Sequence, residues 1–341
     1  MYEFDDARLE DPESLRAADY LLRPLAEAGA RVRREADSAE VPLSRLDSDD
    51  RPRAMITFGP EARLLRAVLE PTCPVPLVAW PRLGLPGWVG PLDIVVVMGG
   101  ADRVSLAAAF EAVRRGCRLL VAGPADSTLA RQSASPSTTL LPTSTGDPLA
   151  AAIVALVALH RLGLGPLVNP EAVADAMDQV ATDSSLGLDA TQNPAKAVAL
   201  ELADAKPMVW GGSILAARAS RRIAEALRSA SGRMVLSADG GALLPLLSEV
   251  PPRDPFADPF EETAAEARPG LVLVDDGMDD EQAAEDRVRL RQAALAQDVI
   301  VSNLAHLSGT ALERYVTVLQ QGLFAAAYLQ IGLGRAGRMS E

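Results

Sequence analysis

The chain has 341 residues, of which 48% are hydrophobic and only 4% aromatic, and its formal net charge is −13. This length is enough for two domains of ordinary size, with cores built mainly from Ala, Val and Leu. The negative charge argues against a nucleic-acid partner, which would need a basic face, and it provides no long-range attraction for an anionic substrate.

Other features of the sequence predict a cytoplasmic protein. Cys73 and Cys117 lack the spacing of metal ligands and are expected to be small buried thiols in a reducing compartment. Residues 1–6 do not resemble a signal peptide, and the apolar run 149–159 has about half the roughly 20 residues that a membrane span needs. We expect no metal, no cofactor and no membrane partner.

The first half of the chain reads as alternating helices and strands. We expect helices at 12–36, 61–69, 104–115 and up to residue 162, strands at 54–59, 75–79, 93–98 and 118–122, and loops at 37–53 and 124–147. The order of strand, glycine turn, helix, glycine and strand predicts a βαβ unit with a parallel sheet.

The pattern repeats in the second half. We expect strands at 208–210, 234–236, 271–274 and 299–302, helices at 215–230, 280–296 and from about 310 onward, and an exposed acidic, proline-rich excursion at 251–269. Two flavodoxin-like α/β lobes with parallel sheets flanked by helices follow from this repeat, with boundaries at 1–165 and 166–341.

Several segments, taken in order, resemble the SIS-domain family, and in particular its bifunctional phosphoglucose/phosphomannose isomerases. The matching segments are Pro76 to Trp80, Leu85 to Val89, Asp93 to Ser105, Asn193-Pro194-Ala195-Lys196, Pro207 to Gly212 and Tyr328-Leu329. Asn193 to Lys196 is the most specific match. The resemblance covers roughly residues 50–341 and implies the SIS-type fold in both lobes.

The resemblance also implies a reaction and its machinery. Such proteins bind a sugar 6-phosphate and move a proton between C1 and C2 through a cis-enediol. A turn rich in Ser, Thr and Gly holds the phosphate at a helix N-terminus, a carboxylate moves the proton, and a cation stabilises the enediolate. A histidine crosses from the partner subunit, so the resemblance implies a homodimer.

The phosphate loop of the family matches residues 97–105. Gly99, Gly100 and Ser105 are the candidate substrate-binding residues here, although both serines of the family's loop are replaced, by Val97 and Gly99. Asp102 places a negative charge where the phosphate would lie. Two interpretations stay open: a plain strand–helix turn, or a site for an oxygen-rich ligand.

Other parts of the catalytic machinery are missing from the first lobe. The turn 57–61 keeps one glycine but places Glu61 near a family serine, which opposes an anionic ligand; the alternative is an ordinary helix start with Pro60 at its first position. The family's arginine falls at Leu149, so the cation is lost.

The family's histidine is missing as well. The matching stretch 237–243 contains no His, Glu or Asn. The two histidines of the chain are His160, expected to lie in the core or at a helix end, and His306, which begins the last helical segment. A catalytic role for either stays open.

The second lobe keeps more of the pattern. Glu225 matches the catalytic glutamate and is the candidate base. Arg218 matches a family arginine and lies seven residues earlier, which places both side chains on one face of the helix. With Gly211, Gly212 and Ser213, Arg218 is a candidate substrate-binding residue in the cleft between the lobes. The alternative for Glu225 is an exposed helical glutamate paired with a neighbouring arginine.

Three functions remain in competition. The first is an SIS-type protein that binds a carbohydrate derivative and has weak or no isomerase activity. The second is a working mannose-6-phosphate/glucose-6-phosphate isomerase with a rebuilt site, and the third is a scaffold without a small-molecule ligand. Because the remaining acids tolerate hydroxyls better than phosphate, a neutral sugar or a nucleotide sugar is the favoured ligand.

Overall fold

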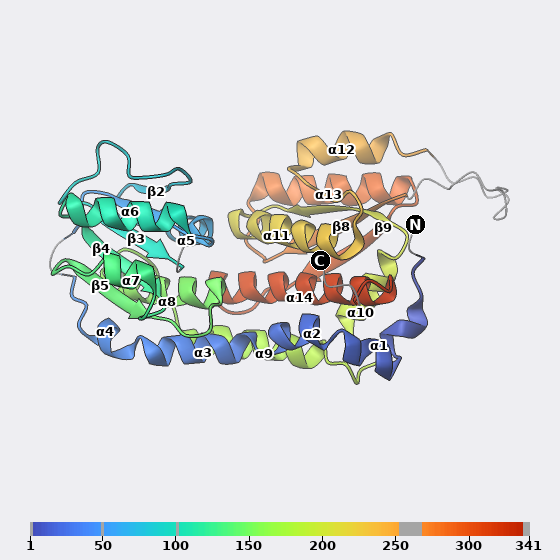
Figure 1. Cartoon of the computed structure of the whole chain (residues 1–341). Coiled ribbons are helices and arrows are strands. Elements are labelled where there is room, and N and C mark those ends of the chain that lie inside the picture. The colour runs from blue at the N-terminus through green and yellow to red at the C-terminus, as the bar shows by residue number, and fades with distance from the viewer. Residues whose placement is uncertain (1–2, 49–50, 100–101, 252–267, 337–341) are drawn as a thin grey trace, which may run out of the picture. The chain divides into compact units, whose positions relative to one another are not determined.

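The computed structural model describes residues 3–48, 51–99, 102–251 and 268–336. The chain forms two compact units, which are described separately (Figure 1). The first unit comprises residues 28–175, and the second combines residues 1–27 with 176–341. No helix among the described residues has both the length and the apolarity that a membrane crossing requires.

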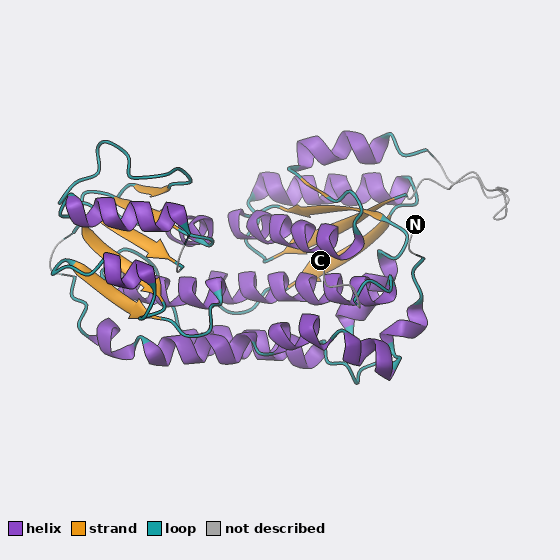
Figure 2. Ribbon diagram, viewed as in Figure 1, coloured by secondary structure: helices purple, strands orange, loops and turns teal. Residues whose placement is uncertain are grey.

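The first unit is built on a parallel sheet with the strand order β2-β1-β3-β4-β5. Its strands are β1 (Met55–Phe58), β2 (Leu77–Ala79), β3 (Ile94–Met98), β4 (Arg118–Gly123) and β5 (Thr138–Pro142). Its helices are α3 (Ala28–Ser38), α4 (Glu40–Ser44), α5 (Ala62–Leu69), α6 (Arg103–Arg114), α7 (Thr128–Gln132) and α8 (Pro148–Arg161). Figure 2 shows these helices around the sheet. All of β3 is buried, as expected for an apolar strand covered on both faces.

Two segments of the first unit correct the predicted loops. The stretch 124–147 contains α7 and the edge strand β5, in which Thr138–Pro142 pair in parallel with Leu119–Gly123 of β4. The stretch 37–53 contains the short helix α4. Serines, threonines and prolines at these positions look like loop residues, but threonine and leucine suit a half-buried edge strand once a partner strand is present.

The second unit contains a parallel sheet with the order β7-β6-β8-β9. Its strands are β6 (Lys206–Gly211), β7 (Leu236–Ser237), β8 (Pro269–Asp275) and β9 (Ile300–Ala305). Its helical segments are η1 (Asp6–Leu9), α1 (Pro12–Ala17), α2 (Asp19–Ala26), α10 (Pro194–Glu201), α11 (Ile214–Ser231), α12 (Gly240–Ser248), α13 (Glu281–Ala296) and α14 (Ala311–Gly332), while α9 (Pro170–Asp183) carries the chain in from the first unit. The helix α12 was not predicted. The expected excursion at 251–269 lies almost entirely outside the described residues.

The N-terminal helices belong to the second unit because they pack on its last helix. The amide of Asp5 donates to the carbonyl of Gly332 at 2.9 Å, and Gln320 Nε2 donates to the carbonyl of Leu25 at 2.8 Å. The compact units therefore differ from a division of the chain into residues 1–165 and 166–341, because the N-terminal helices join the second unit. The lobe boundary between residues 165 and 166 stays a prediction.

Candidate functional site

A pocket of about 450 Å³ lies where the strands of the second sheet end. Gly211 and Gly212 at the end of β6, Ser237 at the end of β7, and Ser220 and Arg221 of α11 line it, together with the start of α12 and α13. In open parallel sheets, ligands bind at the carboxyl ends of the strands, so this pocket has the expected location.

The two predicted glycines bring backbone to the wall of this pocket. A Cβ atom on Gly211 would lie 2.5 Å from the backbone of Ala216, and one on Gly212 would lie 2.6 Å from the Asp279 carboxylate. Neither position has room for a side chain. These glycines are therefore required for the approach of α11 and α13 to β6, and they leave the neighbouring pocket open.

The Ser213 hydroxyl is already engaged in two hydrogen bonds within the protein. It caps α11 by accepting from the amide of Ala216 at 2.9 Å, and it donates to the buried carboxylate of Asp276 at 2.6 Å. Ser213 does not appear among the residues that line the pocket. Its substrate-binding role stays a prediction and would require this link to break.

Arg218 and Glu225 also lie outside the pocket lining. Glu225 is 62% exposed and its carboxylate lies 3.9 Å from Arg222 Nε, which is the geometry of an exposed helical glutamate. The residue of α11 that does place a cation at the pocket is Arg221. The family resemblance predicts Arg218 as the cation that binds the substrate. Arg221, three residues later, lies at the pocket because of how α11 is rotated against the sheet, which the sequence does not reveal.

The charge of the pocket is predominantly negative. Asp239, Asp280 and Asp286 line it, and Arg221 is the single basic residue of the lining. Asp239 and Asp280 are the N-caps of α12 and α13, where each accepts a backbone N–H. Because carboxylates already occupy these helix N-termini, a phosphate would meet repulsion, whereas sugar hydroxyls can donate to the remaining oxygens.

The matching turn of the first unit is likewise occupied by its own carboxylate. Gly99 has a φ of +107°, and Asp102 caps α6 by accepting from the amides of Val104 at 3.0 Å and Ser105 at 2.9 Å. Burial acts to raise the pKa of Asp102, but hydrogen bonds from Ser105 and Val104 outweigh it and the pKa is lowered. Gly100 lies outside the described residues.

We expect Asp102→Ala to lower stability by about 1 kcal/mol through loss of this cap. Because the pKa of Asp102 is lower in the folded state, its contribution is present above the unfolded pKa and is lost as the pH falls through the folded pKa. Denaturant titrations at neutral pH and in acid measure both effects. Equal stability of variant and parent at neutral pH would show that the cap is unimportant.

Asn193 and Tyr328, which belong to two of the matching segments, lie in contact in the fold, with Asn193 Nδ2 3.4 Å from the Tyr328 hydroxyl. Asn193 caps α10 and its Nδ2 donates to the carbonyl of Ser185 at 3.1 Å, while the Tyr328 hydroxyl donates to the carbonyl of Ser184 at 2.7 Å. Burial raises the pKa of Tyr328 to about 12. These side chains hold the segment before α10, which gives the motif a structural role.

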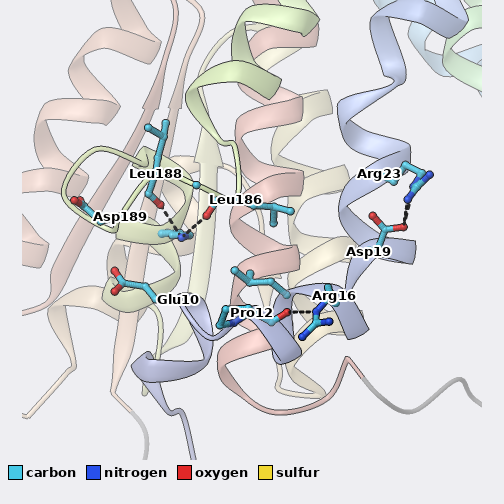
Figure 3. Close-up of a pocket in the computed structure, with 11 residues that line it drawn as sticks. Glu10, Pro12, Arg16, Asp19, Arg23, Leu186, Leu188 and Asp189 are labelled. Carbon is cyan, nitrogen blue, oxygen red and sulfur yellow. Dashed lines mark hydrogen bonds and ion pairs between the residues drawn. The ribbon is translucent and has the colours of Figure 1, made fainter.

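Lys196 completes this network. Its side chain is buried, and its Nζ donates to the carbonyls of Leu186 at 3.3 Å and Leu188 at 2.7 Å, as the dashed lines in Figure 3 mark. Nζ also lies 5.5 Å from the centre of the Tyr328 ring, and burial lowers the lysine pKa. The segment that Lys196 holds forms one wall of a second pocket of about 740 Å³ beside α1 and α2. That pocket does not lie at strand ends.

Lys196→Met is expected to lower stability by about 1.5–3 kcal/mol, because the carbonyls of Leu186 and Leu188 lose a charged donor and the relief from burying an ammonium only partly offsets this loss. Lys206, the other lysine, is exposed, so Lys206→Met is the matched control and should change stability by less than about 0.5 kcal/mol. Urea unfolding of both variants measures the difference; similar midpoints would show that the network contributes little to stability.

The two histidines and the two cysteines lie outside the lining of the pocket at the strand ends. His160 Nδ1 lies 3.1 Å from the carbonyl of Gly165 at the end of α8, and His306 follows β9. Cys117 is buried, which raises its pKa, and Cys73 is half-buried. Within the described ranges, no group of three or more His, Cys, Asp or Glu side chains is arranged to hold a metal ion.

Comparisons with known proteins concern the whole fold. No protein-family model matches the chain, and no curated protein sequence matches it significantly. Among solved structures, it is similar to tagatose-6-phosphate ketose/aldose isomerase from Escherichia coli, with a TM-score of 0.62, 12% identity and coverage of 92% of this chain and 93% of that one.

Two further structures extend the likeness. A glucose-6-phosphate isomerase-like protein from Thermus thermophilus gives a TM-score of 0.55 at 16% identity, covering 95% of this chain and 92% of that one. The C-terminal domain of glucosamine-fructose-6-phosphate aminotransferase from Francisella tularensis gives 0.60 at 12% identity, covering 92% and 96%. The chain therefore has the two-lobed SIS-type fold that the phosphosugar isomerases share.

Proposed function

We propose that this chain is an SIS-type protein that binds a carbohydrate derivative and has weak or no aldose–ketose isomerase activity. The fold and the sugar-phosphate enzymes that share it support the choice of ligand class. The departures at the family's arginine, histidine and phosphate-loop positions support the loss of chemistry.

The observation that carries the proposal is the pocket at the ends of β6 and β7. It combines the location of a ligand site with three carboxylates, Asp239, Asp280 and Asp286, and one guanidinium. Carboxylates accept hydrogen bonds from vicinal sugar hydroxyls, and the imbalance of charge disfavours a bare phosphate. A neutral sugar or a nucleotide sugar is therefore the proposed ligand.

Thermal-shift screening of neutral sugars, nucleotide sugars, sugar phosphates and sulfate tests this proposal, because a ligand of the folded state raises the melting temperature. A hit should be weakened at least about 10-fold by Asp286→Asn, in which one acceptor becomes a donor. The matched control is Asp298→Asn, outside the pocket lining. A hit that is a sugar phosphate, with ordinary turnover, would favour the active isomerase; the absence of any hit would favour the scaffold.

We also propose a homodimer, on the basis of the family resemblance. The last helix offers little apolar surface for this contact. Of its expected seam residues, Val316, Leu319 and Ala326 are buried within the second unit, where α14 packs on α11 and α10, and Leu323 is half-buried. Light scattering at micromolar concentration should give twice the mass of the 35.9 kDa chain. A monomer mass would contradict the proposal.

A further inference from the structure

The first unit contains a fully buried carboxylate that is bound like a ligand. Glu35 of α3 is 0% exposed, and its carboxylate accepts from the amide of Ser144 at 2.8 and 2.9 Å. It also accepts from the amide and from the hydroxyl of Thr145, each at 2.5 Å. The turn 143–147 thus directs three donor groups at one anion, although it lies more than 100 residues away in the sequence.

The negative charge of Glu35 is balanced by dipoles rather than by a basic side chain. Among the described residues, no ion pair to Glu35 is formed; Arg31, one turn earlier on α3, pairs with Asp147 at 2.7 Å instead. The donors of the turn lie just before α8, whose N-terminus is capped by the Asp147 carboxylate, and the charge of Asp147 is in turn paired with Arg31. A hydroxyl together with consecutive amides is the usual chemistry of an oxyanion site.

The location of the turn is that of a ligand site. It follows β5, which ends at Pro142, and it therefore lies at the carboxyl end of the edge strand. At the end of β3 in the same sheet, the N-terminus of α6 is likewise capped by a carboxylate, that of Asp102. In both places, backbone amides at strand ends are already bonded to a carboxylate of this chain.

We propose that the turn 143–147 is an oxyanion site for a carboxylate or phosphate group, and that the Glu35 carboxylate is its built-in occupant. An external oxyanion enters only when Glu35 is removed or displaced. The first unit is consequently closed to a phosphate at this turn. This inference does not rest on the proposed carbohydrate site, which lies in the second unit.

Glu35→Ala tests the site by chemical rescue. The variant loses the anion and leaves the turn's donors without their acceptor, so its melting temperature should fall by roughly 5 °C or more. Formate fits the space left by the side chain and should raise it again, by roughly 3–6 °C at ten times its dissociation constant, relative to chloride at equal ionic strength. Phosphate, which is larger, shows whether the site also admits a tetrahedral oxyanion.

Asp37→Ala, an exposed carboxylate on the same helix, is the matched control, and neither it nor the parent chain should respond to formate. Adding Thr145→Val to Glu35→Ala should reduce the rescue severalfold, because one donor is lost. If Glu35→Ala does not fold, the yield of refolding in formate against chloride decides the same question. Equal behaviour in formate and chloride, or an equal response by Asp37→Ala, would overturn the proposal.

Discussion

Conversion of mannose 6-phosphate or glucose 6-phosphate to fructose 6-phosphate is expected to be at least about 10⁴-fold slower than in an ordinary sugar-phosphate isomerase. The position of the family's arginine is Leu149, and residues 237–243 contain no histidine. Losing such groups typically reduces the rate by about 10²-fold or more apiece. The candidate base Glu225 is 62% exposed, which also leaves it poorly suited to proton transfer in a dry site.

A coupled assay that follows fructose 6-phosphate measures this rate. Background from contaminating host isomerase is removed by comparison with Glu225→Gln, which should have the same low rate as the parent chain. Ordinary turnover that disappears in Glu225→Gln would instead establish the alternative of an active isomerase with a rebuilt site.

Gly59→Ala should destabilise the first unit by more than about 3 kcal/mol. Gly59 follows β1 with a φ of +109°, and a Cβ atom there would lie 2.2 Å from the carbonyl oxygen of Met98 at the end of β3. Both the backbone angle and the collision oppose any side chain, and the colliding atom belongs to the backbone of a buried strand. The turn can relax only by pulling β1 away from β3.

Gly163→Ala separates these two causes. Gly163 also has a positive φ, of +68°, but a Cβ atom there meets nothing within 4 Å, so only the strain of about 1 kcal/mol should appear. Chemical denaturation monitored by circular dichroism compares the two variants. A loss for Gly59→Ala no larger than that for Gly163→Ala would show that β1 and β3 accommodate the side chain.

Much of the architecture follows from the sequence because buried parallel strands are continuous apolar runs. The apolar run 93–98 predicts the strand β3 in this way, and all of β3 is buried. The longer, alanine-rich apolar run 149–159 predicts a buried helix, and residues 150–159 of α8 are buried. The edge strand β5 was missed because its residues are partly exposed and rich in threonine, so pairing with β4 decides its conformation.

The candidate site was predictable only in part. Glycine-rich strand ends identified Gly211 and Gly212, and both line the pocket. The cation Arg221 and the acceptor Asp286 carry no distinctive motif, and their place in the pocket depends on how α11 and α13 pack on the sheet. The bond between Glu35 and the turn at Thr145 joins residues 110 positions apart, and the sequence contains no signal for such a contact.

The most direct test of the proposed function is a map of amide chemical shifts in the ¹⁵N-labelled chain as the sugar found by thermal screening is added. We predict that the largest shifts fall on Gly211, Gly212, Ser237 and Gly240, whose backbone surrounds the pocket. Large shifts confined to other segments, such as residues 186–189, or no shifts with any carbohydrate in the panel, would contradict the assignment of this pocket as the carbohydrate site.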